Sequence, residues 1–124
     1  MIDLSYDITR EIIKAAFEVH NTLGSGFLEK VYENAMVHEL RRNGFKVENQ
    51  KPIQVEYKGE VVGEYFTDII VNDSVIVELK VSNKLSSNHK GQLINYLKST
   101  NLKIGLLVYF TDTKVEYKRI VYNL

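Results

Sequence analysis

The sequence predicts an α+β (mixed α/β) fold in which helices cover a mixed central sheet. Two stretches with helical spacing come first, strand-like segments with a period of two follow, and one helix and two strands complete the chain. The length of 124 residues predicts a single domain over residues 1–124. A hydrophobic fraction of 44% and a charged fraction of 26% are ordinary for a globular protein.

Two amphipathic helices are expected in the first third of the chain. Apolar residues at helical spacing predict a helix over residues 7–23, and Gly24-Ser25-Gly26 then breaks the pattern. A second stripe begins at Leu28 and predicts a helix that ends at Asn43-Gly44. We expect the two helices to pack against each other.

Alternating apolar and polar residues in the middle of the chain predict three strands and a short fourth segment before them. Glycine, asparagine, aspartate and serine mark the turns between these strands. The predicted strands lie over residues 46–48, 53–57, 61–71 and 75–81, with turns at 58–60 and 72–74.

One helix and two strands are expected in the last third. Ser86 or Ser87 can cap a helix that runs to about Ser99. The continuously apolar residues 104–110 predict a strand buried on both faces. Residues 115–121 predict a last strand, and an edge position in the sheet is one possibility for it.

Composition excludes several classes of site and of location. Cysteine is absent, which excludes a disulfide framework, a thiolate metal site and a cysteine nucleophile. The first ten residues do not resemble a secretion signal, and no apolar run approaches the ~20 residues that span a bilayer. We therefore expect a cytoplasmic protein without a membrane partner.

Charge is balanced overall but unevenly distributed. Sixteen basic and sixteen acidic residues give a net charge of zero, so the whole chain offers no electrostatic indication of nucleic-acid binding. Between residues 79 and 111, however, lysines occur without any acidic residue. Lys84, Lys90 and Lys98 are candidate nucleic-acid-binding residues, because lysines neutralise phosphates. A solvated helix face is the equally open alternative.

Three charged residues interrupt the apolar strands of the central hairpin. Glu78 and Lys80 share one face of the predicted strand 75–81, because side chains alternate along a strand. If residues 72–74 form a three-residue loop, Val71 pairs with Val75, and counting back places Asp68 opposite Glu78. The two Cβ atoms would then lie ~5 Å apart. A two-residue turn would break this pairing.

Two opposed carboxylates raise each other's proton affinity, which a bound cation offsets. A hard divalent ion such as Mg²⁺ accepts a few carboxylate oxygens and completes its shell with water and substrate phosphate oxygens. The alternative is that Lys80 only neutralises Glu78 and that Asp68 is a solvated neighbour of the turn. Because Asp68, Glu78 and Lys80 share one face, we favour a site for Mg²⁺ or Mn²⁺.

The same residues carry a family resemblance. Asp68, then Glu78-x-Lys80 on the next strand, then Gln92 on the following helix, resemble the pattern of the PD-(D/E)xK nuclease superfamily. Residues 26–32 match G-x-x-E-x-x-Y, the signature of the GxxExxY protein family within that superfamily. The resemblance extends over nearly the whole chain.

The resemblance implies a restriction-endonuclease-like αβββαβ core and metal-dependent cleavage of phosphodiester bonds in a DNA-type substrate. It implies Asp68 and Glu78 as metal ligands, Lys80 beside the attacking water, and Gln92 as a further catalytic residue. It also implies Glu29 as an acidic member of the site. Threonine rather than proline precedes Asp68, at a position that varies in the superfamily.

Supporting residues are expected on the two helices that flank the site. Glu29 and Tyr32 share one side of their helix. The alternative is that Tyr32 packs in the core and that Glu29 is a first-turn acidic residue stabilised by the helix dipole. Gln92 and Tyr96 are related in the same way, with an ordinary helix face as the alternative. His20 precedes the glycine turn and could line the site, but a packed or capping histidine is favoured.

The leading hypothesis is a divalent-metal-dependent phosphodiesterase that acts on DNA in preference to RNA. The alternative is a catalytically inactive binding or interaction module with the same fold, which the neutral net charge favours. A homodimer is an open arrangement in either case.

Overall fold

The computed structural model describes residues 5–84 and 86–123. The run from the second helix to the fourth strand has the αβββαβ order that the resemblance implies. No helix in the described part of the chain is long and apolar enough to cross a bilayer. The elements are α1 (Ser5–Leu23), α2 (Glu29–Arg42), β1 (Val47–Tyr57), β2 (Glu60–Val71), β3 (Val75–Val81), α3 (Ser87–Thr100), β4 (Ile104–Phe110) and β5 (Val115–Val121).

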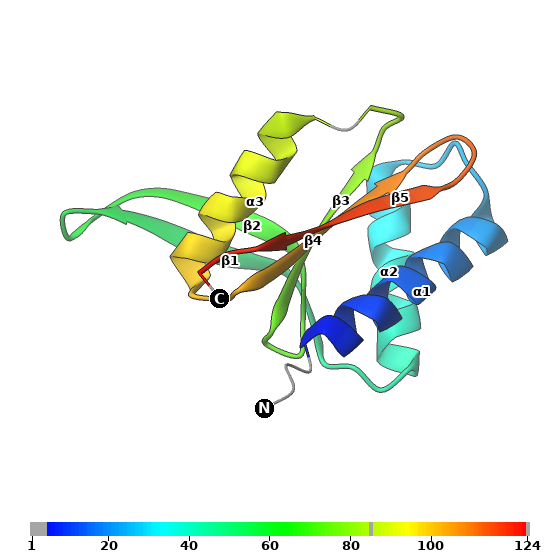
Figure 1. Ribbon diagram of the computed structural model, residues 1–124, viewed down its shortest axis with the longest axis horizontal. Coiled ribbons are helices and arrows are strands. Elements are labelled where there is room, and N and C mark those ends of the chain that lie inside the picture. Colours follow the sequence, from blue (N-terminus) through cyan, green and yellow to red (C-terminus); the bar gives the residue numbers. More distant parts are fainter. Residues whose placement is uncertain (1–4, 85, 124) are drawn as a thin grey trace.

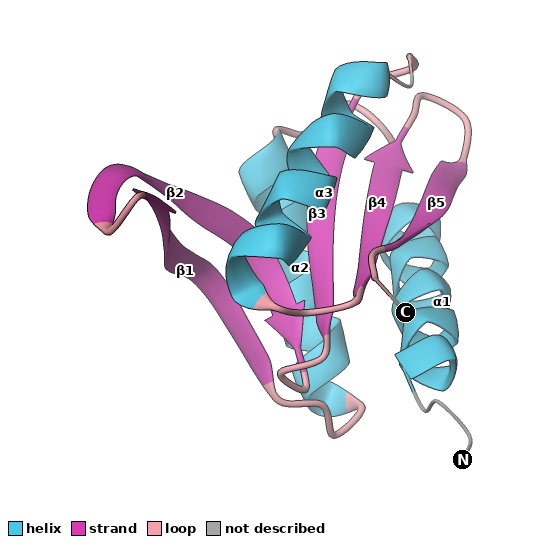
Figure 2. Cartoon of the chain, turned by 60° about the vertical axis from the view of Figure 1, so that its left-hand side comes forward, coloured by secondary structure: helices cyan, strands magenta, loops and turns pink. Residues whose placement is uncertain are grey.

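The strands form one mixed sheet in the order β1-β2-β3-β4-β5. The β3–β4 pair is parallel and the other three pairs are antiparallel. Helix α3 connects the parallel strands and covers one face of the sheet, while α1 and α2 cover the other (Figures 1 and 2). The predicted mixed sheet between helices is confirmed.

Each face of the sheet has its own hydrophobic core, as the period of two requires. In β3, Val77 and Leu79 face the core formed with α1 and α2, whereas Ile76 faces the core formed with α3. Helix α3 comes very close to β4 at Gly105, where an added Cβ atom would lie 2.8 Å from Leu93 Cγ. The lack of a side chain at Gly105 therefore allows Leu93 of α3 to pack directly on β4.

Strand β1 differs from the prediction, because it is one strand of 11 residues and not two short segments. Gln50 has a left-handed backbone with φ 54° and interrupts the alternation that the sequence analysis used. Pairing with β2 continues on both sides of this residue, as Asn49↔Ile69 and Lys51↔Thr67. A local change of backbone conformation, and not the end of a strand, causes the break in the pattern.

The β1–β2 hairpin extends beyond the rest of the sheet as an arm (Figures 1 and 2). Its turn consists of Lys58 and Gly59, which both have positive φ values of 50° and 86°. This is the geometry of a two-residue turn whose twist matches the strands. Glu60 already belongs to β2, so the turn is one residue shorter than predicted.

Candidate active site

The candidate site lies where β2 separates from β3. The three-residue turn at 72–74 and the pairs Val71↔Val75, Ile70↔Ile76 and Ile69↔Val77 are found as predicted. The ladder ends there, so Asp68 and Glu78 are not a ladder pair. Side-chain bonds replace the missing backbone pair: Leu79 N donates to Asp68 Oδ2 at 2.8 Å, and Asp68 N donates to Glu78 Oε1 at 3.3 Å.

The two carboxylates lie side by side because each accepts a hydrogen bond from a backbone N–H group of the other strand. Each bond satisfies a backbone N–H group that the end of the ladder would otherwise leave without a partner. Asp68 and Glu78 therefore lie at the end of the β2–β3 ladder, and these two hydrogen bonds hold them close together.

Glu78 is buried in an environment that does not favour its charge. Its exposed fraction is 5%, and burial together with the charge of Asp68 raises its pKa to about 8. Burial also raises the pKa of Asp68, against the opposing effect of the Leu79 N–H group. A protein interior stabilises two such carboxylates in the charged form only if a cation accompanies them.

Lys80 is half-buried and follows Glu78 by two residues, which places the two side chains on one face. No ion pair between residues described in the structure involves Asp68, Glu78 or Lys80. The alternative in which Lys80 merely neutralises Glu78 therefore lacks the expected contact. Lys80 still acts on the site through its charge, which opposes the rise in the pKa of both carboxyl groups.

Glu29 is the first residue of α2 and is half-buried. Burial raises its pKa, Asp68 raises it further, and Lys80 opposes the rise. Glu29 is therefore within electrostatic influence of both residues, while α2 packs on the face of Val77 and Leu79.

Glu33 and Gln50 influence Asp68 but are not indicated by the sequence. Glu33 lies one turn after Glu29, is 3% exposed and accepts a bond of 3.0 Å from Lys30 Nζ. Gln50 Nε2 donates to both carboxylate oxygens of Glu33, at 3.0 and 3.2 Å. A buried glutamate on a helix whose pattern otherwise looks ordinary leaves no signal in a single sequence.

The donor set suits a divalent cation that keeps part of its hydration shell. Within residues 5–84 and 86–123, no three acidic or histidine side chains already form a complete ligand set. Mg²⁺ needs only one or two protein carboxylates when water and substrate phosphate oxygens supply the rest. Asp68 and Glu78 meet this requirement with carboxylate oxygens, and Glu29 adds a third carboxylate nearby.

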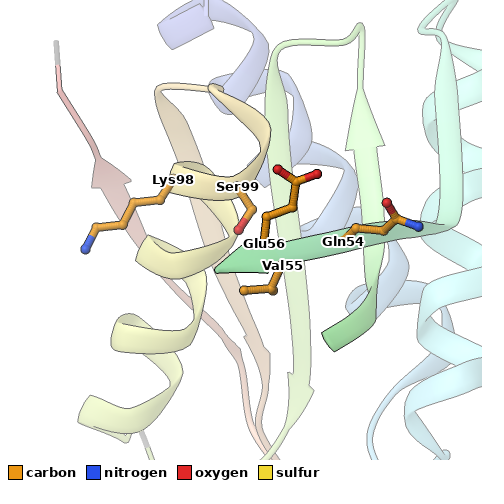
Figure 3. A pocket seen from close by; sticks show the side chains of 5 residues that line it. All are labelled: Gln54, Val55, Glu56, Lys98 and Ser99. Carbon is orange, nitrogen blue, oxygen red and sulfur yellow. The ribbon is translucent and has the colours of Figure 1, made fainter. Parts of the chain in front are cut away.

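A groove lies between the arm and α3. Two neighbouring cavities of about 580 and 560 Å³ share Val55, Lys98 and Ser99 as lining residues. Figure 3 shows the strand residues of the first cavity opposite Ser99, with the Lys98 side chain extending away from them. Gln92 and Tyr96 line the second cavity, so the helix face predicted from the resemblance opens into the groove.

Tyr96 connects this groove with the carboxylates. Its ring stacks on Tyr65 with a centroid distance of 4.0 Å, and its exposed fraction is 8%. Burial and then the charge of Glu78 raise the pKa of Tyr96 to about 12. Gln92 is exposed one turn earlier on the same helix. Tyr96 therefore belongs to the groove lining and is also within the electrostatic influence of Glu78.

Tyr32 and His20 serve the fold beside the site and do not line it. Tyr32 is 1% exposed, stacks on Phe110 at 4.5 Å and donates its hydroxyl proton to Gly24 O at 2.6 Å. His20 Nε2 donates to Thr111 O at 2.9 Å, and its ring also stacks on Phe110. These contacts hold the end of α1 and the start of the loop before Glu29. They agree with the alternative in which Tyr32 and His20 are packed residues of the fold.

The three candidate lysines do not form one patch. Lys98 borders the groove beside the arm, whereas Lys90 borders a separate cavity of about 340 Å³ with residues of β4 and β5. Lys84 lies in the loop before α3 and is exposed. A nucleic-acid strand would meet these lysines at separate points along α3 and its preceding loop.

Comparisons with known proteins agree on the fold. A family model described as the PD-(D/E)XK nuclease superfamily matches residues 6–120. A structure titled "Crystal structure of SSO0001" is 19% identical, with a TM-score of 0.52, and the match covers 94% of this chain and 79% of that chain. An alkaline exonuclease (LHK-Exo) from Laribacter hongkongensis is 13% identical, with a TM-score of 0.51 and coverage of 92% and 82%. No curated protein matches the sequence.

These matches confirm the restriction-endonuclease-like fold class and the superfamily expected from the sequence. The narrower assignment to the GxxExxY family stays a prediction. At such low identities the solved structures support the fold alone, and the chemistry depends on the residues of the site.

Proposed function

The chain belongs to the PD-(D/E)XK nuclease superfamily, and on this premise we propose that it is a divalent-metal-dependent phosphodiesterase acting on DNA. The observation that carries the proposal is the pair formed by buried Glu78 and half-buried Asp68, which has no ion-pair partner in the described chain. A buried charge without a partner is costly unless a ligand of opposite charge offsets the cost. Membership of a superfamily described as nucleases supports a nucleic-acid substrate.

The roles follow from where the side chains lie. Asp68 and Glu78 would hold the metal, with Glu29 binding directly or through water. Bound Mg²⁺ or Mn²⁺ would lower the pKa of a water molecule and neutralise charge on the phosphate. Lys80 lies on the same face as Glu78, so its ammonium group can orient the attacking water or stabilise the negative charge that develops.

The groove suits the strand that carries the cleaved phosphate. Its amides and hydroxyls, including those of Gln92 and Tyr96, can donate to phosphate or base oxygens next to the carboxylates. Lys84, Lys90 and Lys98 would add phosphate contacts outside the groove. We propose DNA before RNA as substrate and a single nuclease domain over residues 1–124. A cytoplasmic location and a homodimer belong to the same proposal.

Separating metal binding from chemistry tests the proposal. Mg²⁺ or Mn²⁺ should raise the melting temperature of the wild type by mass action, and Asp68→Asn should weaken that response. Lys80→Ala should keep the metal response and lose cleavage of labelled DNA, whereas Lys14→Ala, on the exposed face of α1, should keep both. DNA binding without metal-linked stabilisation or cleavage would replace the enzyme with an inactive binding module.

A further inference from the structure

Gln50 has an unusual backbone for its place in the sheet. It lies inside β1 between two residues that pair normally with β2, yet its φ of 54° is in the left-handed region. Only glycine adopts this region without cost, and glutamine is not among the residues that tolerate it well. Such an outlier persists only when its surroundings hold it, and outliers of this kind cluster at functional sites.

The left-handed backbone changes which side of the sheet the Gln50 side chain can reach. Val47 belongs to the core under α1 and α2, so alternation would direct the side chain three residues later to the α3 face. The Gln50 amide instead bonds Glu33 of α2, at 3.0 and 3.2 Å. Glu33 is 3% exposed and is held from its other side by Lys30, so it is a fixed anchor for the amide.

The register places Gln50 directly across from Asp68. The pairs Asn49↔Ile69 and Lys51↔Thr67 enclose this position, but no ladder pair forms between Gln50 and Asp68. The ladder between Asp68 and β3 is interrupted as well. Asp68 therefore has no ladder partner in either neighbouring strand, so its position depends on side-chain contacts.

The Gln50 amide and the Asp68 carboxylate belong to residues that face each other across β1 and β2. Among the described residues the two groups make no hydrogen bond of full geometry, and the amide is bonded to Glu33. Both Glu33 oxygens accept from the same nitrogen, so one amide N–H group can serve both of them and the second N–H group remains for Asp68.

We propose that Gln50, anchored by Glu33, is a positioning residue that sets the place of the Asp68 carboxylate for the metal. The inference rests on the proposed metal-dependent function and adds to it a residue outside the D…E-x-K pattern. Asp68 Oδ2 is bonded to Leu79 N, so a second contact from the β1 side fixes how the carboxylate turns toward a cation. Partners of this kind commonly change metal affinity 10- to 100-fold.

Gln50→Gly separates positioning from backbone effects. Glycine accepts the left-handed conformation, so the variant should unfold in urea at a concentration at least as high as the wild type does, in the absence of metal. It lacks the amide, so its Mn²⁺ affinity, measured by calorimetry without nucleic acid, should fall about 10-fold. Lys58→Gly is the matched control, because Lys58 has φ 50° at the far end of the arm and should leave Mn²⁺ affinity unchanged.

A double-mutant cycle tests the anchor. If Glu33 acts by holding the amide, Glu33→Gln with Gln50→Gly should weaken Mn²⁺ binding less than the product of the two single effects. Wild-type Mn²⁺ affinity in Gln50→Gly, or a loss of metal-free stability in both Gln50→Gly and Gln50→Asn, would overturn the inference. A wild type that binds no Mn²⁺ would overturn the proposed function and this inference together, whereas equal binding by wild type and variant would overturn the inference alone.

Discussion

Glu78→Gln should remove a large part of the pH dependence of stability in the metal-free protein. Glutamine keeps the shape of the side chain and an oxygen that can accept the Asp68 N–H bond, but it cannot ionise. The Glu78 pKa rises from 4.5 to about 8 on folding, mainly through burial. The folded chain therefore keeps a proton that the unfolded chain releases above pH 4.5.

The sign and size of the effect follow from this difference. A group whose pKa is raised by folding contributes stability that is fully present below its unfolded pKa and is lost as pH rises through its folded pKa. Full ionisation would lower the free energy of unfolding by about 5 kcal/mol, at about 1.4 kcal/mol for each pKa unit. Between pH 5 and pH 7 the loss due to Glu78 is about 2.5 kcal/mol, as an upper value, since Asp68 titrates alongside.

Urea unfolding followed by circular dichroism, in buffers containing a chelator, measures the effect. The wild type should lose about 2.5 kcal/mol more than Glu78→Gln between pH 5 and pH 7. Glu60→Gln, an exposed glutamate beside the hairpin turn, should behave as the wild type does. Saturating Mg²⁺ should reduce the loss in the wild type, because metal binds the ionised carboxylates. A difference below about 0.5 kcal/mol between wild type and Glu78→Gln would refute the reasoning.

Three further substitutions test the packing and capping around the site, each by urea unfolding. Gly105→Ala should destabilise the fold by about 1–3 kcal/mol, since its Cβ would meet Leu93 at 2.8 Å; no loss would show that α3 moves away freely. Ser86→Ala should cost about 1 kcal/mol, because the Ser86 hydroxyl caps α3 by accepting from Asn88 N; an unchanged midpoint would make the cap dispensable. Thr67→Val should be neutral or stabilising by up to about 1 kcal/mol, because the buried Thr67 hydroxyl has no partner among the described residues; a clear loss would reveal a hidden contact.

Local chemistry explains why most of the fold could be predicted. The hairpin register followed from one loop length, since a loop over residues 72–74 fixes the three pairs from Val71↔Val75 to Ile69↔Val77, although the predicted pair of Asp68 with Glu78 does not form. Ser86 could be named as a cap because serine accepts backbone N–H bonds at helix starts. The apolar run of β4 indicated burial on both faces, and all of Ile104–Phe110 is buried. Each of these features depends on residues close together in sequence.

The parts that could not be predicted depend on residues distant in sequence. Gln50 and Glu33 bond across 17 positions, and neither belongs to a motif that the sequence displays. The left-handed backbone of Gln50 accompanies that tertiary bond, and the sequence alone predicts a break between two strands there. The lysines around α3 follow one another in the sequence without an intervening acidic residue. Lys90 and Lys98 nevertheless line different cavities, although both lie on α3.

The two carboxylates of the site cannot be treated as chemical groups added to a finished fold. Asp68 and Glu78 accept hydrogen bonds from backbone N–H groups at the point where the β2–β3 ladder ends, so the same two residues belong to the start of the arm and to the site. One oxygen of Asp68 is already occupied by Leu79 N, which leaves Oδ1 as the oxygen free to meet a cation. Replacement by alanine would leave that backbone N–H without its acceptor and disturb the arm, whereas asparagine keeps an acceptor and removes the charge. Loss of activity in an alanine variant would therefore mix the effect on metal binding with an effect on the fold, and the asparagine variant separates them.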